Sequence, residues 1–202
     1  MNVAIIKYNA GNVQSVLYAL QRLGIGAKVT DDADEIRNAD KVIFPGVGHA
    51  FSAMEYLKKS GLDKLITSLR QPVLGICLGL QLLCKQSEEG GTMCLDIFNV
   101  NVRKFEHSLK PGDRNKYKIP QVGWNNIYDL RSPLFSGIKE NSFVYNVHSY
   151  YAELSTQTIA TTDYIIPYSA AMNRDNFYGV QFHSEKSADT GARIISNFIN
   201  LV

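Results

Sequence analysis

The sequence is poor in the features that mark secreted, metal-binding or nucleic-acid-binding proteins. Its three cysteines are odd in number and show no metal-ligand spacing with the four histidines, which argues against a disulfide framework and a zinc site. The net charge of +2 is too small to favour nucleic acid or a membrane surface as a partner. We find no signal-peptide pattern and no apolar run of membrane-spanning length. These absences predict a protein of the reducing cytoplasm without a bound metal.

The composition and the hydrophobic pattern predict one α/β domain. With 45% hydrophobic and 20% charged residues in 202 positions, the chain can bury a sizeable core, and no linker, repeat or low-complexity segment divides it. Strand and helix patterns alternate in the first half, which indicates parallel strands joined by right-handed crossovers. We expect strands at 3–8, 27–30, 41–44 and 73–76, and helices at 12–23, 33–39 and, broken at Gly61, 51–69. Residues 8–11 should form a turn, and Asn12 should be the N-cap of the first helix.

The second half of the sequence has a different pattern of predicted secondary structure. From residue 89, turns with Gly, Pro, Asn and Asp separate predicted strands at 100–105, 143–152, 159–162 and 177–182, and a helix closes the chain at about 188–200. This half is expected to be largely antiparallel. The predicted fold class is a three-layer α/β sandwich with a mainly parallel central sheet and an additional antiparallel β portion, in a single domain that spans 1–202.

The chain is organised around Cys77. The apolar run 73–76 predicts a buried strand, and the leucine spacing after the cysteine predicts a helix. Gly75 and Gly79 flank this turn and give the pattern of a nucleophile elbow, with cysteine in place of serine. The helix N-terminus would stabilise a reactive thiolate, and the Leu78 amide would face an oxyanion formed at the sulfur. A free cysteine is more often structural, but this setting favours a nucleophile.

A cysteine nucleophile requires a base, and the base requires an orienting group. His183 and Glu185 are two residues apart in a predicted extended segment, so both can face one cleft. The glycine-rich segment 45–48 follows a strand and should meet Cys77 at the carboxyl edge of the sheet. His148 is a second candidate base without a carboxylate two residues away. A lone histidine is more often structural, but elbow, base and loop together predict a Cys77–His183–Glu185 triad.

These motifs resemble those of a known family. The segments 75–81, with the sequence GICLGLQ, and 182–185, with FHSE, are similar to the triad segments of class I glutamine amidotransferases. The segment 45–48 resembles the oxyanion loop of that family. Residues 8–12, 119–125 and 147–151 narrow the resemblance to the glutaminase subunits of imidazole glycerol phosphate synthase. The resemblance covers essentially the whole chain.

The resemblance implies a two-step hydrolysis of L-glutamine. Cys77 would attack the side-chain amide carbon, and His183 would protonate the departing ammonia. Water activated by His183 would then hydrolyse the glutamyl thioester, while Glu185 orients the histidine. The backbone amides of Val47 and Leu78 would stabilise the oxyanion intermediates.

The resemblance also implies a substrate pocket and a partner. Gly48, Gln81, Ser149 and Tyr150 match positions at which the family holds glutamine. Ammonia would pass through an internal passage to a cyclase subunit with a (β/α)8 barrel fold, in a heterodimer of histidine biosynthesis. Neither a metal nor an organic cofactor is implied.

Three positions depart from the family pattern. Gln121 stands where the family usually has histidine, Ser184 where it has proline, and Asn9 where it has glycine. The catalytic groups are all retained, but Gln121 lies in a segment near the expected partner face. A paralogous glutaminase that serves another synthase, such as one that amidinates a nucleotide sugar, therefore stays open.

Two further alternatives come from other functional classes. One is a non-catalytic regulatory subunit, against which the intact triad argues. The other is a cysteine hydrolase acting on other amides or esters, against which the glutamine-site matches argue.

Overall fold

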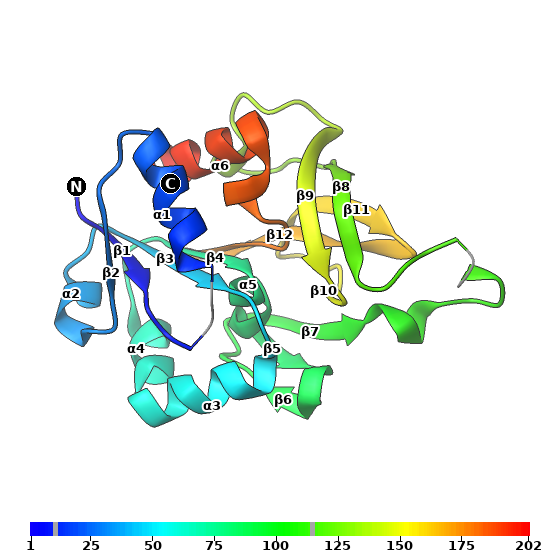
Figure 1. Cartoon of the computed structure of the whole chain (residues 1–202), viewed down its shortest axis with the longest axis horizontal. Coiled ribbons are helices and arrows are strands. Elements are labelled where there is room, and N and C mark those ends of the chain that lie inside the picture. Colours follow the sequence, from blue (N-terminus) through cyan, green and yellow to red (C-terminus); the bar gives the residue numbers. More distant parts are fainter. Residues whose placement is uncertain (10–11, 114–115) are drawn as a thin grey trace.

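A computed structural model describes residues 1–9, 12–113 and 116–202 and places a seven-stranded sheet at the centre of these described parts. The strand order is β11-β12-β13-β4-β3-β1-β2 (Figure 1). The strands from β13 to β2 are parallel, whereas β12 and β11 join the sheet antiparallel. Their bounds are β1 (Val3–Ile6), β2 (Ala27–Thr30), β3 (Lys41–Gly46), β4 (Val73–Cys77), β11 (Thr158–Tyr164), β12 (Ile166–Arg174) and β13 (Phe177–Val180). The predicted, mainly parallel sheet is confirmed.

Helices cover both faces of this sheet (Figure 1). One face carries α1 (Val13–Arg22) and α6 (Ala188–Leu201), and the other carries α2 (Ala33–Arg37), α3 (Ala50–Ser60), α4 (Leu62–Ser68) and α5 (Leu78–Leu83). Strand β1 shows why both faces must be covered, because its side chains are apolar on both sides. Val3 and Ile5 belong to the core under α1 and α6, whereas Ala4 and Ile6 belong to the opposite core. A strand buried on both faces has a continuous apolar sequence. The predicted three-layer α/β sandwich is confirmed.

Two smaller sheets stand beside the central one. A four-stranded sheet has the order β10-β7-β5-β6, and a two-stranded ribbon pairs β8 with β9 in antiparallel register. The connections include short 3-10 turns. The bounds are β5 (Cys84–Ser87), β6 (Thr92–Met93), β7 (Phe98–Lys104), β8 (Gln121–Ile127), β9 (Ser142–His148), β10 (Tyr150–Ala152), η1 (Glu89–Gly91), η2 (Phe105–Ser108), η4 (Pro133–Phe135) and η5 (Ser184–Lys186). None of the helices in the described ranges combines the length and apolar character needed to cross a bilayer.

The prediction of a single strand at 143–152 is wrong, because the structure has two strands there, β9 and β10. The chain breaks at Ser149, because the two halves pair with different sheets: His148 is opposite Gln121 of β8, whereas Tyr150 is opposite Lys104 of β7. The side chain of His148 spans the break, since its Nδ1 lies 2.7 Å from the carbonyl oxygen of Tyr150. Local sequence cannot reveal this change of partner, because both halves are equally suited to a strand.

The first helix begins where predicted, at Val13, but the capping interaction is not the predicted one. Asn12 has a left-handed backbone with φ 80°, and its side chain makes no capping hydrogen bond. Instead its Nδ2 donates to Glu185 Oε1. Residues 10 and 11 of the predicted turn lie outside the described residues. Asn12 therefore links the start of α1 to a segment that is distant in sequence.

Close packing of α5 on β3 and β4 requires glycine. A Cβ atom at Gly79 would overlap the carbonyl oxygen of Phe44 in β3. A Cβ atom at Gly75 would lie 2.8 Å from the carbonyl carbon of Gly79 and 2.8 Å from a methyl carbon of Leu83. The turn between β4 and α5 is thus possible only because both flanking residues lack side chains.

We predict that Gly79→Ala lowers the free energy of unfolding by more than about 3 kcal/mol, because the added methyl group meets rigid backbone. Urea unfolding followed by circular dichroism measures the change. The matched control is Gly26→Ala, since nothing lies within 4 Å of a Cβ atom there. That variant should stay within about 0.5 kcal/mol of wild type. Equal stability of the two variants would contradict the packing argument.

Candidate active site

Cys77 occupies a strained turn at the carboxyl end of β4. Its backbone has φ 55° and ψ −109°, a conformation that non-glycine residues rarely adopt and that costs about 1–3 kcal/mol. The residue ends β4 and directly precedes α5. The residue is 6% exposed and borders a cavity of about 320 Å³. This is the predicted nucleophile elbow, with the sulfur at the edge of the sheet and at a helix N-terminus.

The glycine-rich loop lies beside this turn because of the strand register. Gly46, the last residue of β3, is opposite Cys77 in the parallel pair β3–β4. Val47 and Leu78 are the residues that follow these two, and both line the cavity together with Gly48. Gly48 has φ 114°, which favours glycine. The predicted oxyanion donors therefore border the same cavity as the sulfur.

His183 and Glu185 form the predicted pair, although by a different local geometry. Residues Ser184–Lys186 form the 3-10 turn η5, so the extended segment predicted there is wrong. Glu185 nevertheless reaches back, and its Oε1 lies 2.8 Å from His183 Nδ1. The side chain of Glu185 is 0% exposed and that of His183 is 4% exposed. Cys77 also interacts with the His183 ring and raises its pKa, so the three side chains interact in sequence.

The surroundings of His183 favour the imidazolium. Burial alone would lower the pKa of His183, but the hydrogen bonds with Cys77 and Glu185, and the negative charges of both, raise it to about 10. The Glu185 carboxylate also accepts a hydrogen bond from Asn12 at the same oxygen, Oε1. Two donors on a buried carboxylate fix its position and hence the plane of the imidazole ring.

His148, the second candidate base, is engaged elsewhere. Its Nδ1 donates to the carbonyl oxygen of Tyr150, and its Nε2 lies 3.1 Å from the hydroxyl of Tyr168. Burial lowers the pKa of His148 to about 4, so the ring is neutral near pH 7. Tyr168 also donates to Gln121 Oε1 at 2.9 Å, and Gln121 is buried. His148 is thus part of a buried polar network in which both of its ring nitrogens are occupied.

The cavity of about 320 Å³ brings the predicted site residues together. Glu185, which lies behind His183, is the one predicted residue that does not line it. The lining includes the predicted residues Val47, Gly48, Cys77, Leu78, Gln81, Ser149, Tyr150 and His183, and also Glu89, Pro120, Val147, His148 and Lys186.

Glu89 is a pocket residue that no sequence signal indicates. It begins the 3-10 turn η1, and its Oε2 accepts a hydrogen bond from the Ala50 amide at 2.6 Å. This contact joins the N-terminus of α3 to a segment 39 residues later. Only the tertiary structure brings a carboxylate to this wall of the cavity.

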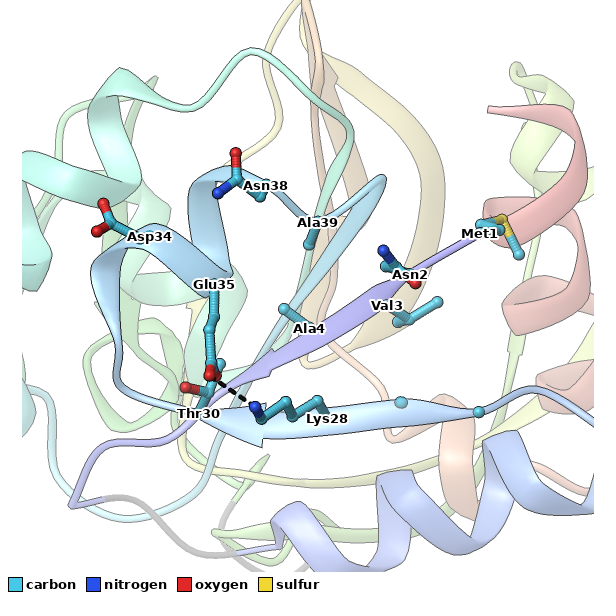
Figure 2. Close-up of a pocket in the computed structure, with 12 residues that line it drawn as sticks. Met1, Asn2, Val3, Ala4, Lys28, Thr30, Asp34, Glu35, Asn38 and Ala39 are labelled. Carbon is cyan, nitrogen blue, oxygen red and sulfur yellow. Dashed lines mark hydrogen bonds and ion pairs between the residues drawn. The ribbon is translucent and has the colours of Figure 1, made fainter.

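A larger cavity of about 620 Å³ lies away from the triad, between β1, β2 and α2. Figure 2 shows the ion pair of Lys28 and Glu35 beside Thr30, with Asp34 on the same helix as Glu35, α2, and Asn38 just after its end. Its walls contain neither cysteine nor histidine. The predicted nucleophile Cys77, the predicted base His183 and the glycine-rich loop all border the smaller cavity, which we therefore take as the candidate active site.

The comparisons with known proteins agree with this geometry. The family model "Glutamine amidotransferase class-I" matches residues 4–201. The imidazole glycerol phosphate synthase subunit HisH of Bacteroides fragilis strain YCH46 is 55% identical over 201 residues, which is 100% of both chains. The protein of the same name from Shewanella loihica is 44% identical and covers 98% of this chain and 89% of its own.

Solved structures show the same fold at low identity. A glutamine amidotransferase from Thermotoga maritima has a TM-score of 0.65 at 19% identity, over 99% of this chain and 83% of its own. The structure of PurLQS from the same organism has a TM-score of 0.71 at 13% identity, over 98% of this chain and 97% of its own. Taken together with the sequence matches, these likenesses place the chain in the class-I glutamine amidotransferase family, in the branch that contains the HisH subunits of imidazole glycerol phosphate synthase.

Proposed function

We propose that the chain is a glutaminase subunit of imidazole glycerol phosphate synthase. It hydrolyses L-glutamine to glutamate and ammonia and passes the ammonia to a cyclase subunit with a (β/α)8 barrel fold, in a cytoplasmic heterodimer of histidine biosynthesis. The observation that carries the proposal is the contact chain from Cys77 through His183 to Glu185 at the wall of one cavity. The three free cysteines fit a reducing compartment.

The geometry supports a two-step acyl transfer. The Cys77 thiolate attacks the side-chain amide carbon of glutamine, and the oxyanion that forms accepts hydrogen bonds from the backbone amides of Val47 and Leu78. His183 gives its proton to the departing nitrogen, which leaves as ammonia with formation of the glutamyl thioester. Water then gives a proton to His183 and attacks the thioester, which releases glutamate and restores the thiolate. Glu185 holds the imidazole throughout.

The raised pKa of His183 suits both steps. Part of the rise comes from the charge and hydrogen bond of Cys77, which disappear when the sulfur becomes a thioester. His183 is therefore an imidazolium before acylation and can act as the acid. After acylation the pKa of His183 falls, because the contribution of Cys77 is lost while burial still opposes protonation. The Glu185 carboxylate remains as the nearby negative charge. The His183 side chain can then take a proton from water.

The pocket offers groups for each end of glutamine. Gly48, Gln81, Ser149 and Tyr150 line it, as the resemblance implies for substrate-binding residues. Glu89 adds a carboxylate that the Ala50 amide holds in place, and we assign it to the substrate ammonium group. A cavity of about 320 Å³ is of the size that suits a small ligand.

The β8–β9 ribbon supports a partner subunit. Val122 and Trp124 of β8 and Phe143 of β9 are 60%, 53% and 59% exposed, an apolar surface larger than isolated residues would give. Trp124 is opposite Tyr145, and their rings lie 5.8 Å apart. Tyr145 in turn accepts a hydrogen bond from the backbone amide of His183 at 2.9 Å. We assign this exposed face to the cyclase, because a partner seated there would lie beside the triad.

The departure at Gln121 does not favour a different synthase. Its side chain is buried and contacts Tyr168, on the opposite side of β8 from the exposed Val122. The substitution therefore changes an internal network and leaves the exposed face of the ribbon unaltered. The named relatives favour the histidine-pathway cyclase over a paralogous partner.

The test of the proposed function is glutamate release from glutamine, with and without a histidine-pathway cyclase and its nucleotide substrate. We expect strong stimulation by cyclase plus nucleotide. Cys77→Ala should lower glutamine-dependent synthesis at least about 10⁴-fold, because the nucleophile is lost, and should spare synthesis from added ammonia. Loss of the ammonia-dependent reaction as well would mean that the chain has another role. Glutamine hydrolysis that this cyclase does not stimulate would leave the assignment of the triad intact and would indicate another synthase as the partner.

We predict that Glu89→Gln raises KM for glutamine about tenfold or more and changes kcat less, because a charge-assisted contact with the substrate ammonium is lost. The amide oxygen can still accept from Ala50, so the fold should be retained. Glu140→Gln is the matched control, since Glu140 accepts hydrogen bonds from the amides of Asp129 and Leu130 and does not line the pocket. An unchanged KM in Glu89→Gln would remove Glu89 from the substrate site.

We predict that Trp124→Ala weakens cyclase binding about tenfold or more, since a large aromatic at the centre of an exposed apolar face is a typical interface anchor. Titration calorimetry with the purified cyclase measures Kd. Leu201→Ala is the control, because Leu201 is also exposed, at the end of α6, and lies outside the ribbon. Equal Kd values for the two variants would mean that the cyclase binds elsewhere.

A further inference from the structure

The side-chain amide of Gln181 faces the sulfur of Cys77. Its Nε2 lies 3.8 Å from Cys77 Sγ, and the residue is fully buried. The position follows from the sheet, because β13 and β4 are parallel neighbours with Val180 opposite Ile76. Cys77 is the last residue of β4, and Gln181 directly follows β13, with its backbone amide donating to the Ala170 carbonyl oxygen of β12 at 2.8 Å. The contact is therefore held by backbone register and does not depend on a surface loop.

A chain of hydrogen bonds fixes which end of this amide faces the sulfur. The backbone carbonyl of Tyr150 can only accept, so the Gln81 group 3.0 Å away is its Nε2 donor. The second N–H of the same Gln81 nitrogen donates to Gln181 Oε1, also at 3.0 Å. With its oxygen engaged by Gln81, Gln181 directs Nε2 toward Cys77. The reverse orientation would bring the Gln181 nitrogen against the Gln81 nitrogen, two donors in contact inside the protein, which costs free energy.

The contacts of the sulfur favour opposite protonation states. The Val147 carbonyl oxygen, 3.9 Å from Sγ, can only accept and so favours the S–H form. The Gln181 N–H can only donate to the sulfur and so favours the thiolate, as does the His183 imidazolium. The hydroxyls of Tyr8 and Tyr168 also interact electrostatically with Cys77, while each donates a hydrogen bond elsewhere, to the Pro45 carbonyl oxygen and to Gln121 Oε1. Burial raises the pKa of both tyrosines, so they stay neutral.

We propose that Gln181 is a further catalytic residue, an amide donor that stabilises the Cys77 thiolate and is held in its orientation by Gln81. The inference rests on the proposed function, in which Cys77 is the nucleophile. It connects the pocket wall to the sulfur, because Gln81 lines the pocket and also anchors the donor. A hydrogen bond to a charged acceptor is stronger than one between neutral groups. Its loss should therefore reduce the thiolate population measurably.

The test is the rate of Cys77 alkylation by iodoacetamide in the isolated chain, from about pH 5 to about pH 10, read by mass spectrometry of the Cys77 peptide. Burial raises the pKa of Cys84 far above its ordinary value and that of Cys94 to about 12, so these thiols react slowly and serve as internal references. Gln181→Met keeps the length of the side chain and removes the donor. We expect its pH midpoint to move upward, with a rate about tenfold lower near neutral pH and an unchanged plateau at high pH.

Two further variants define the result. Gln181→Glu keeps an oxygen for Gln81, and its midpoint should also move upward, because loss of the amide donor and like-charge repulsion both disfavour the thiolate. Gln71→Met is the matched control, because the Gln71 amide donates to the Ile36 carbonyl at 2.7 Å, before the start of β4, and its loss should leave the Cys77 midpoint unchanged.

The outcomes separate the two proposals. A wild-type midpoint in folded Gln181→Met or Gln181→Glu overturns the role of Gln181. So does a plateau that changes without a shift of the midpoint, which is the signature of altered packing or access. If Gln181→Met does not fold, Gln181→Leu decides, because it also removes the donor and adds no charge. Absence of glutamine hydrolysis by the wild-type chain with its cyclase overturns the proposed function instead, and the midpoint measurement stands apart from it.

Discussion

The close approach of Gly79 to the carbonyl oxygen of Phe44 is the contact on which the site depends. It allows α5 to begin immediately after β4, and this forces Cys77 into a backbone conformation with positive φ. Such strain persists only where the surrounding packing determines it. The strands β3 and β4, which are buried almost throughout, supply that packing. The packing around one turn thus holds a cysteine at the carboxyl edge of the sheet.

Around that turn the protein assembles charges that stabilise one another. The Glu185 carboxylate is buried, yet it contacts His183 and Asn12, and His183 contacts Cys77. Removing a partner from such a buried system leaves an uncompensated group, which costs more than the loss of the contact alone. The system is connected to three elements, since Asn12 precedes α1, Cys77 ends β4 and Glu185 lies in η5. Its geometry thus depends on how α1 and η5 pack against the central sheet.

Hydrogen bonds connect the candidate site to the exposed β8–β9 ribbon. The backbone amide of Tyr145 donates to Ser187 Oγ at 2.9 Å, and this hydroxyl donates to the carbonyl oxygen of His183 at 2.7 Å. Together with the bond from the His183 amide to the Tyr145 carbonyl oxygen, these contacts connect β9 to the segment that carries His183 and Glu185. The face of the ribbon that Trp124 occupies is exposed, while Gln121 is buried. The exposed face of the ribbon is therefore separated from His183 by a short chain of hydrogen bonds.

The sequence by itself determined the alternation of strands and helices, the elbow at Cys77 and the pairing of His183 with Glu185, because these follow from local patterns and from short spacings along the chain. It did not indicate the break at Ser149 or the strand β12. A turn at Ile165, with φ 67°, joins β11 to β12 without the Asn-Gly type of signal that marks many hairpins.

The tertiary structure alone decided three features of the site. These are the contact of Asn12 with Glu185 in place of a helix cap, the amide of Gln181 at the sulfur, and the carboxylate of Glu89 in the pocket. The hydrogen bonds that place these side chains join residues at least 39 positions apart. Local patterns do not reach over such separations, and only the completed packing of the sheets and helices fixes the distances.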